Sequence, residues 1–260
     1  MKKYLAILKT SFLADLAYKV NFFFYFFRQT LQILISLLLW RTVFLEKLVF
    51  QGYSFQDLIY YFFILFFVQT FVDSDAAYNL SGLIKSGDLS NSLLWPLSFF
   101  WSFFSFHWGK KVYRLFYFLL GIIILAAVST TGMNPLKIII FAVILINAAL
   151  LIFLYQFFLG SLSFWLVNIS STLWFLRQIT DLAGGGWLPL DFFPKNLSAF
   201  ARVLPFYLTV GFPIEFFQGK ITAVLVLKNI FSQYFWIFIL FFVVAFLWRK
   251  GVKEYEAVGK

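Results

Sequence analysis

The sequence YNLSGLIKSGDLSNSLLWPLSFFWSFFSFHWGKK occupies residues 78–111 and lies between two long apolar runs. It is a polar insert that carries a turn at residues 85–88, Lys-Ser-Gly-Asp. Gly87 can adopt positive φ at such a turn, and Asp88 can cap a helix that follows it. The flanking runs are long enough to cross a membrane, so the insert separates spans on either side of it.

The residues after this turn predict a short amphipathic helix outside the bilayer. Leu89, Leu93 and Leu94 fall on helical spacing, and Pro96 is suited to end the helix. The same segment is also compatible with a loop that only joins two spans. Both interpretations place residues 78–111 at the membrane surface.

Composition places the chain among integral membrane proteins. Of its 260 residues, 62% are hydrophobic, 24% are aromatic and only 12% are charged, whereas an ordinary soluble domain is about 25% charged. Because each span uses about 20 residues, we expect one all-α membrane domain over residues 1–260. The formal charge of +10 is dispersed among apolar segments, which does not indicate a nucleic-acid partner. The chain has no cysteine, which excludes disulfides and thiolate metal sites.

The apolar runs predict six transmembrane helices. The segment from Lys137 to Ala183 is too long for one crossing, so a reversal at residues 160–163 divides it in two. Arg28 lies inside the first span, from where its long side chain can reach the interface. The predicted spans are residues 21–44, 57–77, 112–130, 137–159, a fifth that reaches Ala183, and 224–248.

Residues 1–19 predict an interfacial helix ahead of the first span. Leu5, Leu8, Phe12 and Leu16 fall on one helical face, and lysines are available to meet anionic headgroups. The alternative is a cytoplasmic extension of the first span. Charged residues interrupt any uniform apolar core in this segment, so it does not resemble a cleavable signal peptide.

Three glycines and a proline end the fifth span. Gly184, Gly185 and Gly186 lower the helix propensity, and Pro189 lacks the amide needed to continue a helix. Further prolines divide residues 184–223 into pieces too short to cross a bilayer. This connection therefore predicts short helices that dip into the interface.

The sequence shows few groups suited to catalysis. The nearest approach to a P-loop, from Gly211 to Lys220, has the wrong spacing and lacks the hydroxyl residue. His107 is the only histidine, so a histidine-pair zinc site is excluded within one chain and no metal site is predicted. Arg177 and Asp181 are spaced i, i+4 and predict an intramembrane ion pair. Both a structural pair and a substrate or proton site are compatible with this spacing.

The distribution of basic residues predicts the orientation. Six spans place both termini on one side, and more lysines and arginines flank the face with the termini and residues 78–111 than flank the opposite face. By the positive-inside rule, both termini and this insert are predicted to be cytoplasmic, and residues 184–223 are predicted to be outside. The predicted location is the cell membrane, inner or plasma.

The order of these parts resembles the permease subunit of a type-two ABC exporter. The resemblance covers nearly the whole chain and rests on two stretches, IKSGDLSNSLLWPLS at residues 84–98 and GGGWLPLDFFPKNLSAFARVLPFYLTVGFPIEFFQGK at residues 184–220. It implies two permease subunits, identical or related, that bind separate P-loop ATPase subunits. No cofactor is then expected in this chain, and ATP and magnesium are expected on the partner ATPase.

The resemblance also implies roles for two groups of residues. The coupling-helix region, which docks the ATPase, matches Lys85, Ser86, Gly87, Asp88, Leu89, Leu93, Leu94 and Pro96. A candidate outer gate comprises Gly184, Gly185, Gly186 and Pro189. The expected function is ATP-driven export of an unidentified substrate. The abundant aromatics suit an amphipathic cargo and equally suit contact with the lipid bilayer. The alternatives are an ATP-independent secondary transporter and a membrane scaffold.

Overall fold

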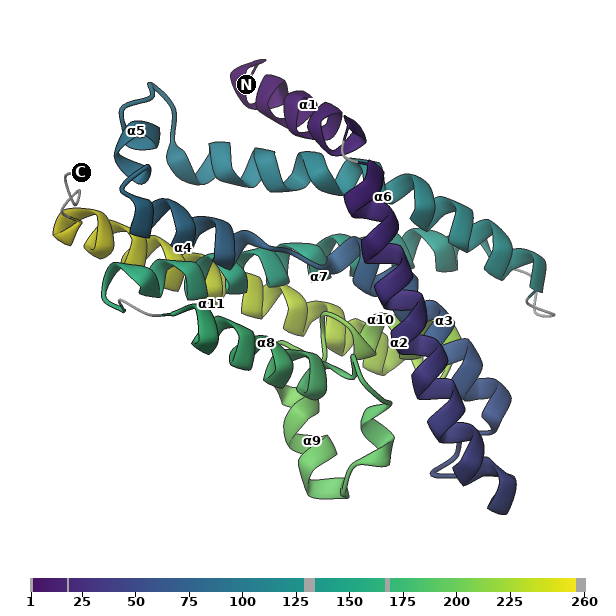
Figure 1. Cartoon of the computed structure of the whole chain (residues 1–260). Coiled ribbons are helices and arrows are strands. Elements are labelled where there is room, and N and C mark those ends of the chain that lie inside the picture. Colours follow the sequence, from purple (N-terminus) through teal and green to yellow (C-terminus); the bar gives the residue numbers. More distant parts are fainter. Residues whose placement is uncertain (1, 18, 129–133, 167–168, 256–260) are drawn as a thin grey trace.

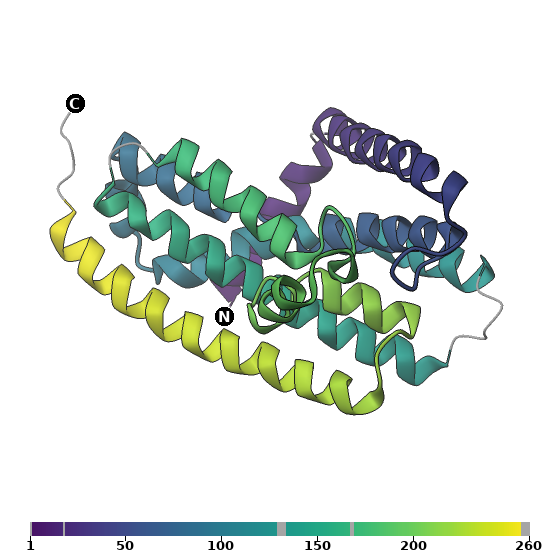
Figure 2. The ribbon, with the colours of Figure 1, turned by 90° about the horizontal axis from the view of Figure 1, so that it is seen from below.

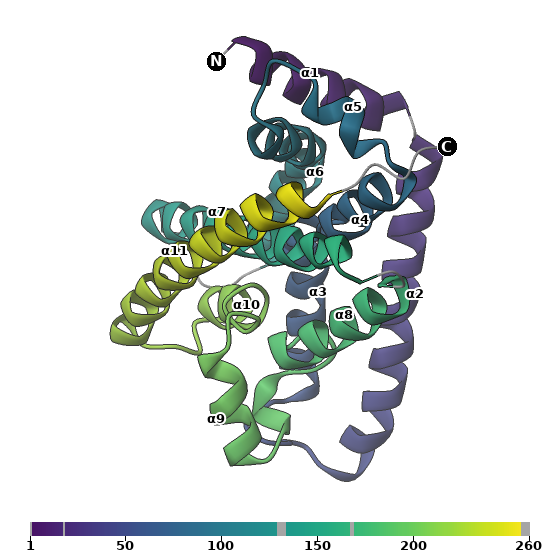
Figure 3. The same ribbon diagram turned by 90° about the vertical axis from the view of Figure 1, so that its left-hand side faces the viewer.

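The computed structural model describes residues 2–17, 19–128, 134–166 and 169–255, and these residues form an all-helical structure (Figure 1). In chain order the elements are α1 (Lys2–Ala17), α2 (Lys19–Glu46), α3 (Phe55–Val72), α4 (Ala76–Ser86), α5 (Leu89–Leu93), α6 (Phe99–Val128), α7 (Pro135–Ser161), the 3-10 turn η1 (Leu162–Phe164), α8 (Ser170–Gly184), the 3-10 turn η2 (Leu190–Phe192), α9 (Lys195–Val203), α10 (Gly211–Gln218) and α11 (Ala223–Glu254). α1 and α5 lie at one end of the molecule and α9 lies at the other (Figures 1 and 3).

α3 and α7 form the centre of the bundle. α7 is largely apolar from Ile138 to Phe158, and most of its residues from Ile144 onward are buried. α3, α4 and α11 pack against it, and Figure 2 shows α11 and α2 on opposite sides of this centre. Gly160 allows α4 to approach α7 closely, because a Cβ atom there would lie 2.9 Å from the Cβ atom of Leu80.

Three helical segments among the described residues are long and apolar enough to cross a membrane: Phe55–Ser86, Pro135–Phe164 and Ala223–Glu254. They correspond to the second, fourth and sixth predicted spans. α8, at the place of the fifth, has 15 residues, whereas a full crossing needs about 20. The end of the third predicted span, residues 129–130, lies outside the described residues. The all-helical class is confirmed, and the number of six spans stays a prediction.

The helix of the second predicted span is interrupted near its end. That span was expected to continue to Ala77, but α3 ends at Val72 and Asp73 adopts an extended backbone with ψ of 145°. The chain becomes helical again at Ala76, where α4 begins. Charged side chains from α6 and α8 bind the residues of this break, and they replace the hydrogen bonds that a continuous helix would make.

The aromatic part of residues 78–111 is helical and does not lie in a loop. α6 begins at Phe99, whereas the third span was expected to begin at Val112. The rings in the first turns of α6 pack on the core helices: Phe100 lies 5.2 Å from Phe157 and Phe99 lies 4.7 Å from Trp248, measured between ring centroids. This packing of large apolar rings extends the helix towards α5.

α1 is a helix of its own that lies across the start of α6 (Figure 3). The Ser11 hydroxyl donates a hydrogen bond of 2.6 Å to the Phe106 carbonyl of α6. Gly109 lies at the crossing, where an added Cβ atom would overlap the Leu8 carbonyl. A separate N-terminal helix is therefore present, as expected, and its place at the membrane interface stays a prediction.

Candidate functional site

The helix predicted after the turn is present as α5, and its residues divide into an anchor and an exposed surface. Gly87 has φ of +83° and reverses the chain between α4 and α5, as the turn signal predicted. Leu89 is fully buried, whereas Leu93 is 36% exposed and Leu94 is 82% exposed. α5 therefore holds to the bundle through one leucine and presents two others to the surroundings.

The remaining predicted coupling residues lie around this surface. Lys85, Ser86, Asp88 and Pro96 are exposed. Asp88 is the N-cap residue of α5, as predicted, but its side chain makes no capping hydrogen bond with that helix. Asp88 instead accepts a hydrogen bond of 2.6 Å from the Ser86 hydroxyl, which stabilises the turn on its α4 side.

The break between α3 and α4 lies beneath this surface and joins α6 to α3. The ammonium group of Lys111 donates to the carbonyls of Phe71, Val72 and Asp73 at 2.9, 2.8 and 2.8 Å. Lys111 is only 3% exposed, so a buried cation satisfies the last carbonyls of α3. This cap holds the broken helix in place.

The second aspartate of the break binds two further residues of α6. Asp75 lies 3.2 Å from Nδ1 of His107 and 3.2 Å from Nζ of Lys110. His107 is 3% exposed, so it is packed inside the protein. The residues of α6 that were expected in a surface insert thus bind the α3–α4 break. We call the break and its partners on α6 the junction.

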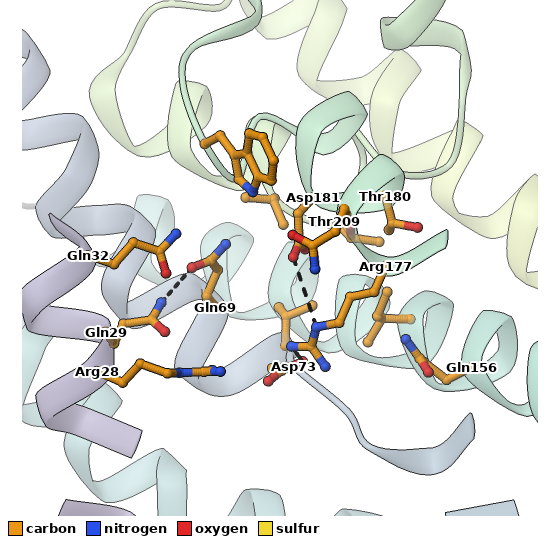
Figure 4. A pocket seen from close by; sticks show the side chains of 15 residues that line it. Arg28, Gln29, Gln32, Gln69, Asp73, Gln156, Arg177, Thr180, Asp181 and Thr209 are labelled. Atoms are coloured by element: carbon orange, nitrogen blue, oxygen red, sulfur yellow. Dashed lines mark hydrogen bonds and ion pairs between the residues drawn. The ribbon is translucent and has the colours of Figure 1, made fainter. Parts of the chain in front are cut away.

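A polar cavity of about 150 Å³ lies between α2, α3, α7 and α8 (Figure 4). Its charged residues include the predicted ion pair, since Nε of Arg177 lies 4.0 Å from Asp181. Asp73 is a closer partner, at 2.7 Å from the Arg177 guanidinium. The spacing i, i+4 revealed the first contact, but Asp73 lies in the break after α3, far from Arg177 in the sequence, and no local pattern indicates it. Asp73, a residue of the α3–α4 break, therefore forms part of the cavity wall.

The glycine run ends α8, as predicted. Gly184 is the last helical residue, and Gly185 follows with φ of +84°. The Gly186 amide donates to the Asp181 carbonyl at 2.6 Å, which is the hydrogen bond that closes a helix with a left-handed residue. The Gly185 carbonyl accepts a hydrogen bond of 2.5 Å from the Tyr61 hydroxyl. Pro189 comes directly before η2. The glycine run therefore ends α8 and packs against α3.

A change of Gly185 to alanine is expected to lower the free energy of unfolding by about 1–2 kcal/mol, the usual cost of a left-handed backbone for a residue with a Cβ atom. The new Cβ atom would also lie 2.8 Å from the Tyr61 hydroxyl. Gly82→Ala in α4 is the matched control, because no atom lies within 4 Å of its added Cβ. That control is expected to raise stability by up to about 1 kcal/mol. Thermal unfolding in detergent measures both, and equal shifts would contradict the assignment of Gly185.

A buried ionic cluster holds the connection between α8 and α11, and the sequence did not predict it. The Arg202 guanidinium of α9 binds both carboxylate oxygens of Glu215 at 2.8 Å and Asp191 at 2.8 Å. The Tyr207 hydroxyl donates to Glu215 at 2.7 Å, and Glu215 is 4% exposed. Burial lowers the pKa of Arg202, but its hydrogen bonds and its proximity to Glu215 outweigh burial and raise that pKa. The ion pairs of Arg202 therefore connect η2, α9 and α10.

Comparison with known proteins agrees with this arrangement. A family model described as ABC-2 family transporter protein matches residues 30–259. No curated protein matches the chain. The family match includes α3 to α11 and most of α2. Because this match covers most of the chain, the protein belongs to the ABC-2 transporter family of membrane permeases, a family that lacks a nucleotide-binding domain.

Proposed function

We propose that this chain is the permease subunit of an ABC exporter whose ATP and magnesium are bound by separate P-loop ATPase subunits. ABC-2 permeases generally pair with ATPase subunits, which supports the proposal. The observation that carries it is α5, a short helix anchored by buried Leu89 that presents Leu93 and Leu94. An exposed pair of leucines on an anchored helix suits a groove on a soluble partner. Two permease subunits, identical or related, would complete the assembly.

The junction offers a route from α5 to the interior. α4 connects α5 to the α3–α4 break, where Lys111 of α6 and Arg177 of α8 both bind. A displacement of α5 by a closing ATPase would therefore reach three further helices through direct hydrogen bonds. Exposed aromatic residues of α8, Trp174 and Phe175, are available to line a path between two permease subunits. This is alternating access driven from the α5 end.

The proposed orientation places α1, α5 and both termini in the cytoplasm and residues 184–223 outside. It rests on the positive-inside distribution of lysine and arginine. The chain is then one permease domain, residues 1–260, with an interfacial helix at 1–19, a coupling insert at 78–111 and an outer connection at 184–223. The outer gate remains proposed for Gly184, Gly185, Gly186 and Pro189. A transport assay of gate variants needs correction for folded protein, because alanine at these glycines meets packed atoms.

The proposal is tested by co-purification of an ATPase from native membranes with the double variant Leu93→Asp, Leu94→Asp. Two carboxylates on the presented surface of α5 are expected to reduce the recovered ATPase at least tenfold, because they would have to lose water on docking. Leu48→Asp is the matched control, since Leu48 is 91% exposed and lies beyond the far end of α2. Unchanged recovery in the double variant would refute α5 as the docking element. A chain that recovers no ATPase at all would favour an ATP-independent transporter or a scaffold.

A further inference from the structure

We propose that the polar cavity between α2, α3, α7 and α8 binds an uncharged ligand group that both donates and accepts hydrogen bonds, such as the hydroxyl-rich ring of a sugar. The proposal concerns ligand recognition by this chain alone. That such a ligand is also transported rests on the proposed function. Figure 4 shows side chains from these four helices pointing into the same space.

The wall of the cavity is rich in carboxamide groups. A carboxamide carries one acceptor and two donors, so it suits a partner that offers both kinds of group. The glutamines that line the cavity are Gln29, Gln32, Gln69, Gln156 and Gln178. Thr180 and Thr209 add hydroxyl groups. Such a lining offers both donors and acceptors to hydroxyl groups, whereas an ion would need an excess of the opposite charge.

The charges around the cavity balance. Arg28 and Arg177 contribute two positive charges, and Asp73 and Asp181 contribute two negative charges. The closest approach is 2.7 Å between Arg177 and Asp73, so these two largely neutralise each other. An anion would meet both carboxylates, and a cation would meet both guanidinium groups. The electrostatics therefore favour a ligand without net charge.

Gln156 of α7 is the residue that most directly indicates a ligand. It is 4% exposed, it lines the cavity, and it makes no hydrogen bond to any residue that the structure describes. Gln233 of α11 shows what the chain does with a purely structural buried amide. Gln233 donates to the carbonyls of Ile144 and Leu208 at 3.1 and 3.0 Å and accepts from Asn147 at 3.3 Å. A buried amide that only faces a cavity needs a partner from outside the protein.

A neighbouring pair of glutamines holds the opposite wall in shape. The Gln29 amide of α2 donates to the Gln69 carbonyl oxygen of α3 at 2.5 Å. This contact fixes one amide from each helix and leaves the Gln69 amide hydrogens and the Gln29 oxygen for a ligand. Gln29 is 6% exposed, and its hydrogen bond to Gln69 needs no ligand. The shape of this wall is therefore set before a ligand binds. Binding then requires little reorganisation of these side chains.

The volume of the cavity limits the size of the group. A space of about 150 Å³ is similar to a protein cavity that binds benzene, so it suits a single ring or headgroup. The lining residues Arg28, Gln32 and Trp187 are exposed, so the cavity opens on the side of α2. Apolar residues such as Leu31 are exposed on the same helix. The group could therefore arrive free or as the headgroup of a lipid.

Binding of labelled sugars to the purified transporter tests the proposal. The full chain, with any subunits that co-purify, is placed in phosphatidylcholine nanodiscs. The probes are tritiated glucosyl-diacylglycerol, tritiated methyl glucoside and tritiated phosphatidylglycerol as an anionic comparison. Gln156→Leu is expected to weaken binding of the sugar probe at least tenfold while the thermal midpoint stays equal or rises, because no hydrogen bond within the described structure is lost. Gln218→Leu is the control, since its amide donates to the Asp57 carbonyl away from the cavity.

Each outcome decides the proposal. Binding of the glucosyl lipid that Gln156→Leu removes would support it with a lipid source, and equal binding of methyl glucoside would support it with a soluble source. Absence of binding by both sugar probes would overturn it, as would preference for phosphatidylglycerol or unchanged binding by Gln156→Leu. The ATPase content of the same preparation is measured separately. Absence of sugar binding with ATPase present would overturn this proposal and leave the proposed function intact. Sugar binding without any ATPase would support this proposal and contradict the proposed function.

Discussion

Replacement of Lys111 by methionine is expected to lower the free energy of unfolding by about 1–3 kcal/mol. The variant removes the donor that satisfies the carbonyls of Phe71, Val72 and Asp73. A buried acceptor left without a partner costs about 1–3 kcal/mol. Arg114 lies 3.3 Å from the Asp73 carbonyl and can recover part of this loss. The thermal midpoint in detergent and the midpoint of unfolding by denaturing detergent both measure the effect.

The neighbouring residue provides the control for this prediction. Lys110→Met removes a cation of the same kind from the same turn of α6. Its ammonium group lies 3.2 Å from Asp75, whose side chain is 50% exposed, and such half-solvated pairs contribute less than about 1 kcal/mol. Equal destabilisation by the two variants would mean that Lys111 acts only through its charge. The cap on α3 would then have no special role.

The contrast between these two lysines also shows where sequence patterns stop being informative. Gly109-Lys110-Lys111 reads as the polar end of an insert, because local composition cannot show that one lysine is buried. The carbonyls that bind Lys111 belong to residues 71–73, on a different helix. α3 ends there for the same reason, since its broken hydrogen bonds are satisfied by α6 and not by the next residues in the chain.

Features that depend on neighbouring residues were predictable. The positive φ of Gly87 and the end of α8 at the glycine run follow from backbone sterics, which act within one or two residues. The start and end of α7 agree closely with the span predicted at 137–159, since a long apolar run is sufficient to define a buried helix. The expected place of the Arg177–Asp181 contact follows from helical geometry alone.

The candidate sites themselves were only partly predictable. The exposed leucines of α5 stand in one stretch, so the sequence could propose them together. The glutamines of the cavity come from four helices, so no local pattern in the sequence places them together. Their common feature appears only after the helices pack. A search for uncharged polar residues within predicted spans would have singled out Gln69 and Gln156 as candidates.

The change of Arg202 to alanine is expected to lower the free energy of unfolding by about 3–5 kcal/mol, the usual cost of leaving a buried charge without its partner. Glu215 is 4% exposed and would lose two hydrogen bonds of 2.8 Å. Thermal unfolding of the purified protein measures this loss. Lys195→Ala is the control, because Lys195 is an exposed cation on the same helix, α9. A similar shift in both variants would show that helix content, and not the ion pair, explains the change.

Removal of both partners separates the two possible causes of that loss. The double variant Arg202→Met, Glu215→Leu buries no charge, so it is expected to recover at least half of the stability lost by Arg202→Ala. Asp191 can rely on water in this variant, since its side chain is 39% exposed. If the double variant is less stable than the single one, the ion pair stabilises the connection by its own attraction. If it recovers, the pair mainly specifies how η2, α9 and α10 pack, and apolar residues of similar size can hold the same helices together.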